Sequence, residues 1–425
     1  MENKQVSFLK TCINGINALS GIGILSIPYA LSAGGWLSLI LLILIAVAAC
    51  FTGILMRRCM DRNPNVTGYS DIASHAFGRK GKLVASLFTS LELYFVATGL
   101  LIMEGDNLHK LCPNFALKLG SLSIDGRHSV VILAGILILP TMWLSNLDVM
   151  SYVSACGVLS SLVVVVCVLC VGVTKGVGFH GKGSLINLQG VPTAVSMYAF
   201  CYGAHAMFPS IYNSMRKKSQ FSKVRYGFFS IQFNMANDER IRPAIFSFLL
   251  PFQVMFISFV MCTITNLSMA VLGYLIYGQS VQSQVTLNLP MQKLSSKIAI
   301  YTILAGPIAK YALTITPVAA AIESVLSDRY QDSKPIGILI RMSLLTSTAV
   351  MAMVFPSFQS VTSLSGAVLI VFVSFLLPCA CYLKIFEVNQ KWGIELACIL
   401  TIMLMSVVGG AVGTYSSIAQ TVKHN

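Results

Sequence analysis

Charged side chains are scarce in this sequence. Only 10% of the 425 residues are charged and 15 are acidic, whereas 56% are hydrophobic and the mean hydropathy is +0.77. This composition excludes an ordinary water-soluble globular protein. Because one membrane-spanning helix takes roughly 20 apolar residues, the chain has room for about a dozen such helices and for no sizeable soluble domain. We therefore expect one integral membrane domain over residues 1–425.

Motifs for nucleotide hydrolysis and for common hydrolases are absent. The chain contains no G-x-x-x-x-G-K-[ST], no H-E-x-x-H and no G-x-S-x-G, so neither an ATP-driven pump nor a recognisable hydrolase is supported. The 12 cysteines are scattered through apolar runs, and the C-x-x-C of Cys167 and Cys170 has no third or fourth ligand nearby. We expect no enzyme activity, no metal and no cofactor.

Long apolar runs fill most of the chain. They lie at about residues 7–33, 35–57, 83–104, 129–145, 150–174, 191–214, 254–277, 298–326, 336–355, 361–383 and 393–416. Their lengths fit membrane-spanning helices, several of them long enough to tilt. The sequence therefore predicts an all-α membrane protein with about eleven transmembrane helices.

The net charge of +14 lies in the connecting segments. Lysine and arginine concentrate in alternate loops, with basic clusters at residues 57–62, 79–82 and 216–225. Cytosolic loops of membrane proteins carry this excess, so the pattern predicts a cytosolic N-terminus. The basic charge is then explained without a nucleic acid partner. The partner that it suggests is anionic membrane lipid, to which the basic loops would be weakly attracted.

Residues 225–253 do not fit the pattern of apolar runs joined by short basic loops. The stretch "RYGFFSIQFNMANDERIRPAIFSFLLPFQ" separates a basic loop from an apolar run that is already a complete helix from Val254 to Gly278. Two interpretations stay open. One is a retained intron, because the Phe-, Leu-, Ser- and Pro-rich end resembles a translated pyrimidine tract. The other is a genuine loop with a short amphipathic segment.

Two apolar runs are interrupted by helix-breaking residues. "NALSGIGILSIPYAL" in the first run carries Gly21, Gly23 and Pro28, and "MYAFCYGAHAMFPSIYNSM" in the sixth carries Gly203 and Pro209. Non-helical backbone at membrane depth survives only where protein or a water-filled cavity satisfies it. Interruptions at corresponding places in two halves predict a 5+5 inverted repeat with a binding site at the breaks, plus one extra helix. A kinked helix packed through small residues is the alternative for either run.

Four segments are distinctive: "NGINALSGIGILSIPYALSAGGW", "GAHAMFPSIYNSM", "AVLGYLIYG" and "PIAKYALTITPVA". Together they resemble the amino acid/auxin permease family, in particular its plant vacuolar amino-acid transporter branch, and the resemblance covers nearly the whole chain. It implies the leucine-transporter fold, with broken first and sixth helices that hold an amino acid at the bilayer midplane, driven by a proton or sodium gradient. The vacuolar membrane is the expected location, with the plasma membrane as the alternative.

The resemblance also implies which residues form the site. The substrate carboxylate is expected at backbone amides of the first break, and the substrate ammonium at carbonyls of the sixth. Asn17 matches a position where sodium-coupled relatives use an amide oxygen as an ion ligand, with a helix–helix hydrogen bond as its alternative role. The expected substrate-binding residues are Asn17, Ser20, Gly21, Ile22, Gly23, Tyr202 and Gly203.

Three ionisable residues inside apolar runs are candidates for ion coupling. Lys310 lies between Pro307 and Pro317, too deep to reach the interface easily. In the implied architecture its ammonium takes the place of a sodium ion near the carbonyls of the first break, which favours proton coupling over sodium; a permanently charged strut is the alternative. Glu92 is a proton relay or an ion-pair partner. His205, beside the sixth break, is a coupling residue or a packing residue.

Glu104 and Asp106 in "MEGDN" are interpreted as a solvated helix end. The function that these features predict is secondary active transport of amino acids by alternating access, with protons as the coupling ion. The alternative is a transceptor, which binds an amino acid and signals with little flux.

Overall fold

The computed structural model describes residues 8–63, 66–119, 122–143, 149–174, 177–179, 183–213, 253–326, 333–355, 357–387 and 393–424. Residues 225–252, most of the atypical insert, lie outside the described residues. The retained-intron interpretation therefore remains a prediction.

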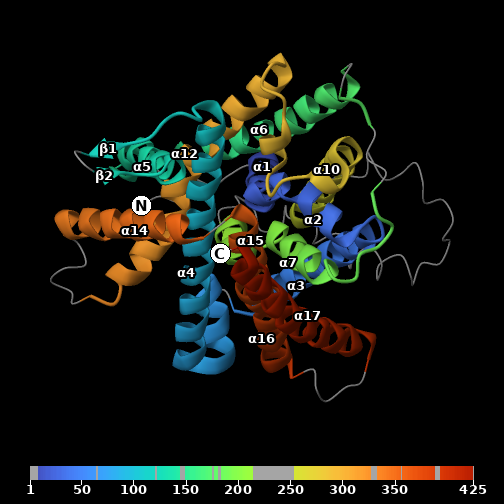
Figure 1. Cartoon of the computed structure of the whole chain (residues 1–425). Helices are drawn as coiled ribbons and strands as arrows, with labels where there is room; N and C mark the ends of the chain where they lie inside the picture. The colour runs from blue at the N-terminus through green and yellow to red at the C-terminus, as the bar shows by residue number, and fades with distance from the viewer. Residues whose placement is uncertain are drawn as a thin grey trace.

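The described chain is almost entirely helical (Figure 1). The first half contains α1 (Phe8–Leu19), η1 (Ile22–Leu25), α2 (Ile27–Gly34), α3 (Ser38–Arg62), α4 (Tyr69–Leu111), the strands β1 (Lys118–Leu119) and β2 (Leu122–Ser123), α5 (Gly126–Ile138), η2 (Leu139–Trp143) and α6 (Val149–Val173). The second half contains α7 (Val191–Cys201), η3 (His205–Met207), α8 (Phe208–Asn213), α10 (Gln253–Tyr277), η6 (Gly278–Ser280), α11 (Val285–Asn288), α12 (Leu294–Glu323), α14 (Lys334–Val354), α15 (Phe358–Ser365), the π-helix η7 (Gly366–Leu376), α16 (Leu377–Phe386) and α17 (Ile394–His424).

Eight helices of the described chain are long and apolar enough to cross a membrane, and Gly126–Met142 is a shorter apolar segment. The first and sixth runs fall below that length because each is interrupted, so all eleven predicted runs are present as helical segments. The third is longer than predicted, because a helix ahead of the span merges with it across a kink at Gly78, whose φ is +67°. The fold is an all-α membrane bundle with the predicted broken first and sixth helices.

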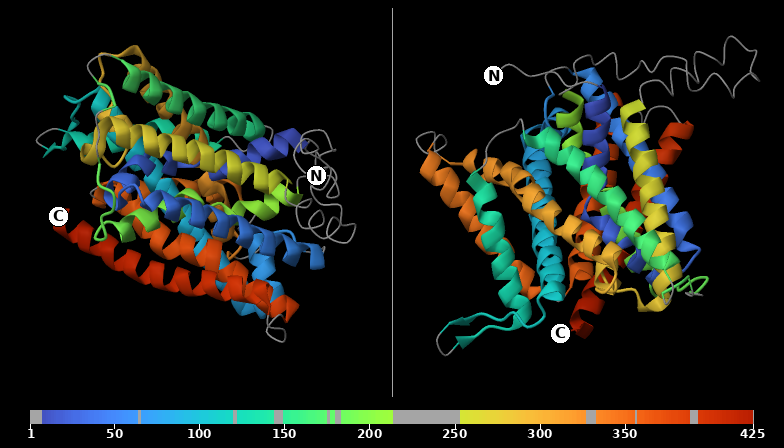
Figure 2. Two further views of the ribbon diagram at one scale, coloured as in Figure 1. Left: turned by 90° about the vertical axis from the view of Figure 1, so that its right-hand side faces the viewer. Right: turned by 90° about the horizontal axis from the view of Figure 1, so that it is seen from above.

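The helices run side by side as one bundle (Figure 2, right). The start of α1 lies at one end, and the C-terminal end of α17 lies at the other, on the side of the β1–β2 hairpin. An odd number of crossings places the two ends of a chain on opposite sides of a membrane, so this arrangement agrees with eleven helices.

Polar residues inside the bundle are bonded mostly back to their own helices or across a helix pair. One example joins the first and second halves: the hydroxyls of Ser38 in α3 and Tyr198 in α7 lie 2.9 Å apart. Within lipid, helices associate through such hydrogen bonds and through close packing of small residues rather than through the hydrophobic effect. The contacts of glycines and buried polar groups therefore decide where the two broken helices sit.

Candidate functional site

The first broken helix unwinds directly after α1. α1 ends at Leu19, Ser20 and Gly21 follow, and one turn of 3₁₀-helix, η1, occupies Ile22–Leu25 before α2 begins with Pro28 in its first turn. A helix start leaves its first backbone N–H groups without intrahelical acceptors, and proline tolerates this position because it has no N–H. Pro28, one of the helix-breaking residues of the first run, therefore lies at the start of the second half-helix.

The glycines of this break act differently from what the sequence suggests. Gly21 has φ −72° and ψ −170°, a conformation open to any residue, and Gly23 is not among the glycines with positive φ. The unwinding therefore does not depend on glycine's freedom to adopt a left-handed backbone. Gly23 is required by space: an added Cβ would lie 2.6 Å from the Sγ of Cys201 and 3.2 Å from its Cα.

The sixth broken helix unwinds at the matching place. α7 ends at Cys201, Tyr202 to Ala204 form a non-helical turn, and η3 and α8 continue from His205. Because Gly23 of η1 lies directly against Cys201, the two breaks touch one another inside the bundle. This contact is the arrangement that the interrupted sequence pattern predicts.

A pocket opens beside the first break. The empty space inside it and in its open mouth together amounts to about 450 Å³. The walls come from η1 and the residues around it, α4, α6 and α12. The lining residues are Gly21, Ile22, Ile24, Leu25, Met103, Gly157, Ser160, Ser161, Val164, Thr302, Ile303, Gly306, Pro307 and Lys310.

Among the described residues that line the pocket, Lys310 is the one with a charged side chain. Its Nζ donates to the carbonyl oxygen of Ser20 over 3.3 Å, so the ammonium of α12 reaches the unwound segment of the first helix. The structure thus brings Lys310 to the carbonyls that the sequence analysis expected it to approach. A single long hydrogen bond leaves two of its three N–H donors for other acceptors.

Asn17 and Lys310 come together on Gly157 of α6. A Cβ added at Gly157 would lie 2.0 Å from the Oδ1 of Asn17 and 3.1 Å from the Cε of Lys310. The Oδ1 of Asn17 is buried and has no hydrogen-bond partner among the described residues. Gly157 was missed by the sequence analysis, although the small residues of "SACGVLSS" are a signal of close helix packing at this depth.

Tyr202 and Gly203, the predicted substrate-binding residues of the sixth break, lie outside this pocket. The hydroxyl of Tyr202 bonds Thr263 at 3.0 Å, and its ring stacks on Phe259 with centroids 6.1 Å apart. A Cβ added at Gly203 would meet Ile370 of η7 at 2.3 Å. Both residues therefore fix the sixth break against α10 and η7 and do not line the pocket.

His205 fastens the sixth break to α3. Its Nε2 lies 3.1 Å from the carbonyl oxygen of Ala49 and 2.9 Å from Oγ1 of Thr52. Since the carbonyl only accepts, the geometry assigns the proton to Nε2. Nδ1 is buried without a partner among the described residues, so a second proton there would have no acceptor.

Glu92 lies away from the pocket on the same helix as Met103. Eleven positions along an α-helix correspond to about 16 Å. Glu92 is 2% exposed, and its Oε2 has no hydrogen-bond partner among the described residues. The predicted ion-pair partner of Glu92 is not found in the part of the chain that the structure describes.

The interpretation of Glu104 as a solvated helix end is wrong. Glu104 is 1% exposed, because α4 continues for two further turns to Leu111 and α5 packs against it. Asp106 is half-buried and held by neighbours: Gln284 donates to it over 2.8 Å, and the Nε of Arg127 lies 3.8 Å away.

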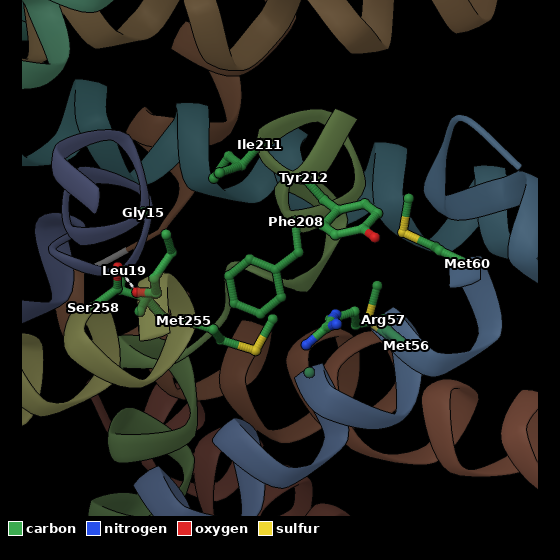
Figure 3. A pocket seen from close by; sticks show the side chains of 12 residues that line it. Gly15, Leu19, Met56, Arg57, Met60, Phe208, Ile211, Tyr212, Met255 and Ser258 are labelled. Atoms are coloured by element: carbon green, nitrogen blue, oxygen red, sulfur yellow. Dashed lines mark hydrogen bonds between the residues drawn. The ribbon is translucent and has the colours of Figure 1, made fainter. Parts of the chain in front are cut away.

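A second pocket lies between α1, α3, α8 and α10 (Figure 3). Its walls are mainly apolar, and Figure 3 shows Arg57 facing Phe208 and Tyr212 across it. Beside it the hydroxyl of Tyr212 bonds Asp61 at 2.5 Å, and Asp61 pairs with Arg57 at 3.3 Å. This network ties the second half of the sixth helix to the end of α3.

Comparison with known proteins decides the family. A family profile described as transmembrane amino acid transporter protein matches residues 4–234 and 226–419. The chain belongs to this family. It is a family of transporters, so the expectation of a protein that is not an enzyme is confirmed, as is the resemblance read from the first and sixth helices.

Curated relatives agree with this assignment. The amino acid transporter AVT1I of Arabidopsis thaliana is 46% identical over 96% of this chain and 94% of its own length. The amino acid transporter AVT1J of the same plant is 44% identical over 97% of this chain and 91% of its own length. The vesicular inhibitory amino acid transporter of Xenopus tropicalis is 23% identical over 89% of this chain and 70% of its own length.

Solved structures share the fold at low sequence identity. A Na⁺-coupled sialic acid symporter in a substrate-bound outward-open state superposes with a TM-score of 0.53 at 13% identity, over 97% of this chain and 89% of that one. Mhp1, a nucleobase-cation-symport-1 family transporter in a closed conformation, gives 0.54 at 11% identity, over 99% and 93%. The fold of this chain is therefore of the leucine-transporter type.

Proposed function

We propose that this protein is a secondary active transporter that moves amino acids across a membrane by alternating access, coupled to protons. The observation that carries the proposal is the pair of broken helices in contact at Gly23 and Cys201, with Lys310 on the carbonyl of Ser20 beside a pocket. The names of the Arabidopsis relatives support the substrate class.

The substrate is held by backbone rather than by a charged cage. The amides of Ile22 and Gly23 at the start of η1 face the carboxylate, since a helix start carries a partial positive charge, whereas those of Ser20 and Gly21 already donate to the carbonyls of Ile16 and Leu19. The ammonium is held by carbonyls of the sixth break near Tyr202 and Gly203. That half of the site forms only when the sixth helix moves toward the pocket, since neither residue lines it here.

Neutral amino acids fit the pocket best. Its walls combine Ile, Leu, Val and Met with Gly, Ser and Thr, and no acidic side chain is among its lining residues within the described chain. A cationic side chain of a substrate would meet Lys310 without a compensating carboxylate, and an unpaired buried charge is costly. We expect neutral apolar amino acids to be preferred over lysine and arginine.

Lys310 is the coupling residue of this proposal. When its amine carries the proton, the ammonium holds the unwound carbonyl of Ser20, as a sodium ion would; when the proton leaves, that bond weakens and the first helix is released. Protons are therefore the coupling ion rather than sodium. Lysine suits this role because desolvation makes its charge easy to lose.

Transport into reconstituted vesicles tests the proposal. We expect concentrative uptake of neutral amino acids with an imposed pH gradient and no added requirement for sodium. Lys310→Met should abolish accumulation and leave exchange between two amino acid pools, whereas Lys297→Met, on the exposed face of the same helix, should change neither. Specific amino acid binding by the purified protein without flux in any gradient would support a transceptor instead.

We further propose a vacuolar membrane location with the N-terminus in the cytosol. The distribution of lysine and arginine and the resemblance to the plant vacuolar branch support this orientation and membrane. Imaging of a fluorescent fusion together with a vacuolar membrane marker tests the location, and protease protection of an N-terminal epitope in intact vacuoles tests the orientation.

A further inference from the structure

Glu104 is a buried carboxyl group that has no role in the transport mechanism proposed above. It follows Met103, a wall residue of the pocket, in the half of α4 next to the β1–β2 hairpin. Both of its carboxyl oxygens are buried and have no hydrogen-bond partner among the described residues. The side chain therefore forms no structural bond that would account for a carboxyl at this depth.

The cations near this end of α4 are already engaged. Lys110 donates to the backbone oxygens of Thr286 and Leu287 over 2.8 Å each and of Leu289 over 2.5 Å. Arg127 pairs with Asp106 and donates to the carbonyl of Phe355 over 2.9 Å. The titratable and charged residues of this end of α4 and of the elements packed against it include Asp106, His109, Lys110, Arg127, His128, Lys297, Tyr301, Lys310, Tyr311, Glu323 and Arg341, and none of them pairs with Glu104 in the described chain.

Further buried polar atoms without partners in the described chain lie on this end of α4 and on α11 and α12, which pack against α4. Asn107 is on the same face of α4, because positions three apart are neighbours on a helix. Its side chain donates to Gln284 over 2.9 Å, while its Oδ1 has no partner among the described residues. The hydroxyls of Thr286 in α11 and Ser296 at the start of α12 are buried in the same unpartnered way. Such groups in a native protein call for a functional explanation.

We propose that Glu104 is a second proton-binding residue of the transport cycle, loaded from the membrane side where α11 covers the bundle. A proton from that side reaches a carboxylate oxygen of Glu104 along the polar atoms of Asn107, Thr286 and Ser296. The carboxylate becomes a neutral carboxyl, no other bond changes, and the proton leaves to the opposite side when the pocket opens there. Charge neutralisation then allows α4 and α11 to close over the substrate, because an uncompensated charge is excluded from the membrane interior.

This inference rests on the proposed function and deepens its proton coupling. It is tested with Glu104→Gln and Glu104→Met in full-length protein reconstituted into vesicles, with Glu387→Gln as the exposed control. Three quantities are measured for each: exchange of amino acid without a gradient, accumulation driven by a pH gradient, and proton entry per substrate from a lumenal pH dye. Thermal unfolding in detergent reports the fold.

We expect both Glu104 variants to keep exchange, to lose accumulation to the level seen without a gradient, and to carry fewer protons per substrate. Glu104→Met should unfold at the wild-type temperature or above it, because it removes buried polar atoms that have no partner. Accumulation at the wild-type level in Glu104→Gln overturns the inference, as does loss of the fold in both variants. If the wild-type protein does not accumulate amino acid in response to the pH gradient, the proposed proton coupling is wrong, independently of the Glu104 variants.

Discussion

Gly157 in α6 lies directly against Asn17 in α1: a single added methyl group would sit 2.0 Å from the side-chain oxygen of Asn17. The same methyl group would also meet the Cε of Lys310 at 3.1 Å. One glycine on a helix that carries no charged site residue thus sets how closely the amide of the first helix and the ammonium of α12 approach each other.

Gly157→Ala should therefore impair transport, although glycine has no side chain that could bind substrate or a proton. Overpacking of this kind costs about 1–3 kcal/mol, and here it displaces the coupling lysine. We expect lower gradient-driven uptake with a larger loss than in amino acid exchange. Gly306→Ala is the matched control, because Gly306 lines the same pocket and has open space for a Cβ.

The double variant Asn17→Ala with Gly157→Ala identifies the cause. If the clash with Asn17 is responsible, shortening Asn17 restores part of the exchange activity lost in Gly157→Ala. An identical defect in Gly306→Ala, or no rescue in the double variant, would contradict this account.

Gly23→Ala and Gly21→Ala form a second matched pair, two positions apart in one unwound segment. The Cβ at residue 23 would strike the sulfur of Cys201 at 2.6 Å, whereas nothing lies within 4 Å of a Cβ at residue 21. We expect Gly23→Ala to lower the unfolding temperature and abolish uptake, and Gly21→Ala to fold normally. Equal unfolding temperatures for the two variants would show that the two breaks do not depend on this contact.

Tyr212→Phe should loosen the end of the bundle that holds the pocket of Figure 3. The substitution removes the 2.5 Å bond to Asp61 that joins α8 to α3. We expect faster labelling of the buried Cys12, one turn before Gly15 of that pocket, by a water-soluble maleimide, quantified by mass spectrometry. Tyr301→Phe, at a tyrosine that is 60% exposed, is the control, and an unchanged labelling rate in Tyr212→Phe would show that the bond to Asp61 does not hold this end of the bundle closed.

His205→Leu separates a positioning role from a coupling role. Loss of the bonds to Ala49 and Thr52 should cost about 0.5–1.5 kcal/mol of stability, because the Thr52 hydroxyl still donates to the Ala49 carbonyl. If His205 only positions the sixth break, the dependence of uptake on pH keeps its midpoint while the unfolding temperature falls. A shifted midpoint of the pH dependence in the folded variant would show that His205 takes part in proton coupling.

The sequence by itself determined the class of molecule and the places where its helices break. Scarcity of charge, apolar runs of membrane length and breakers in the first and sixth runs are local properties, and local composition governs which segments can span a bilayer. The start of α2 at Pro28 follows from the same local chemistry, since proline is best tolerated in the first turn of a helix.

Tertiary structure alone decided which side chains meet and which remain buried. The pattern around Glu104 resembles a helix end in the sequence, yet two more turns of α4 and the packing of α5 bury it. The small residues around Gly157 indicate close packing but not its partner, and its importance comes from Asn17 and Lys310, which are 140 and 153 positions away along the chain. Contacts between distant segments depend on how helices pack, and packing depends on shape in three dimensions rather than on the period of an apolar run.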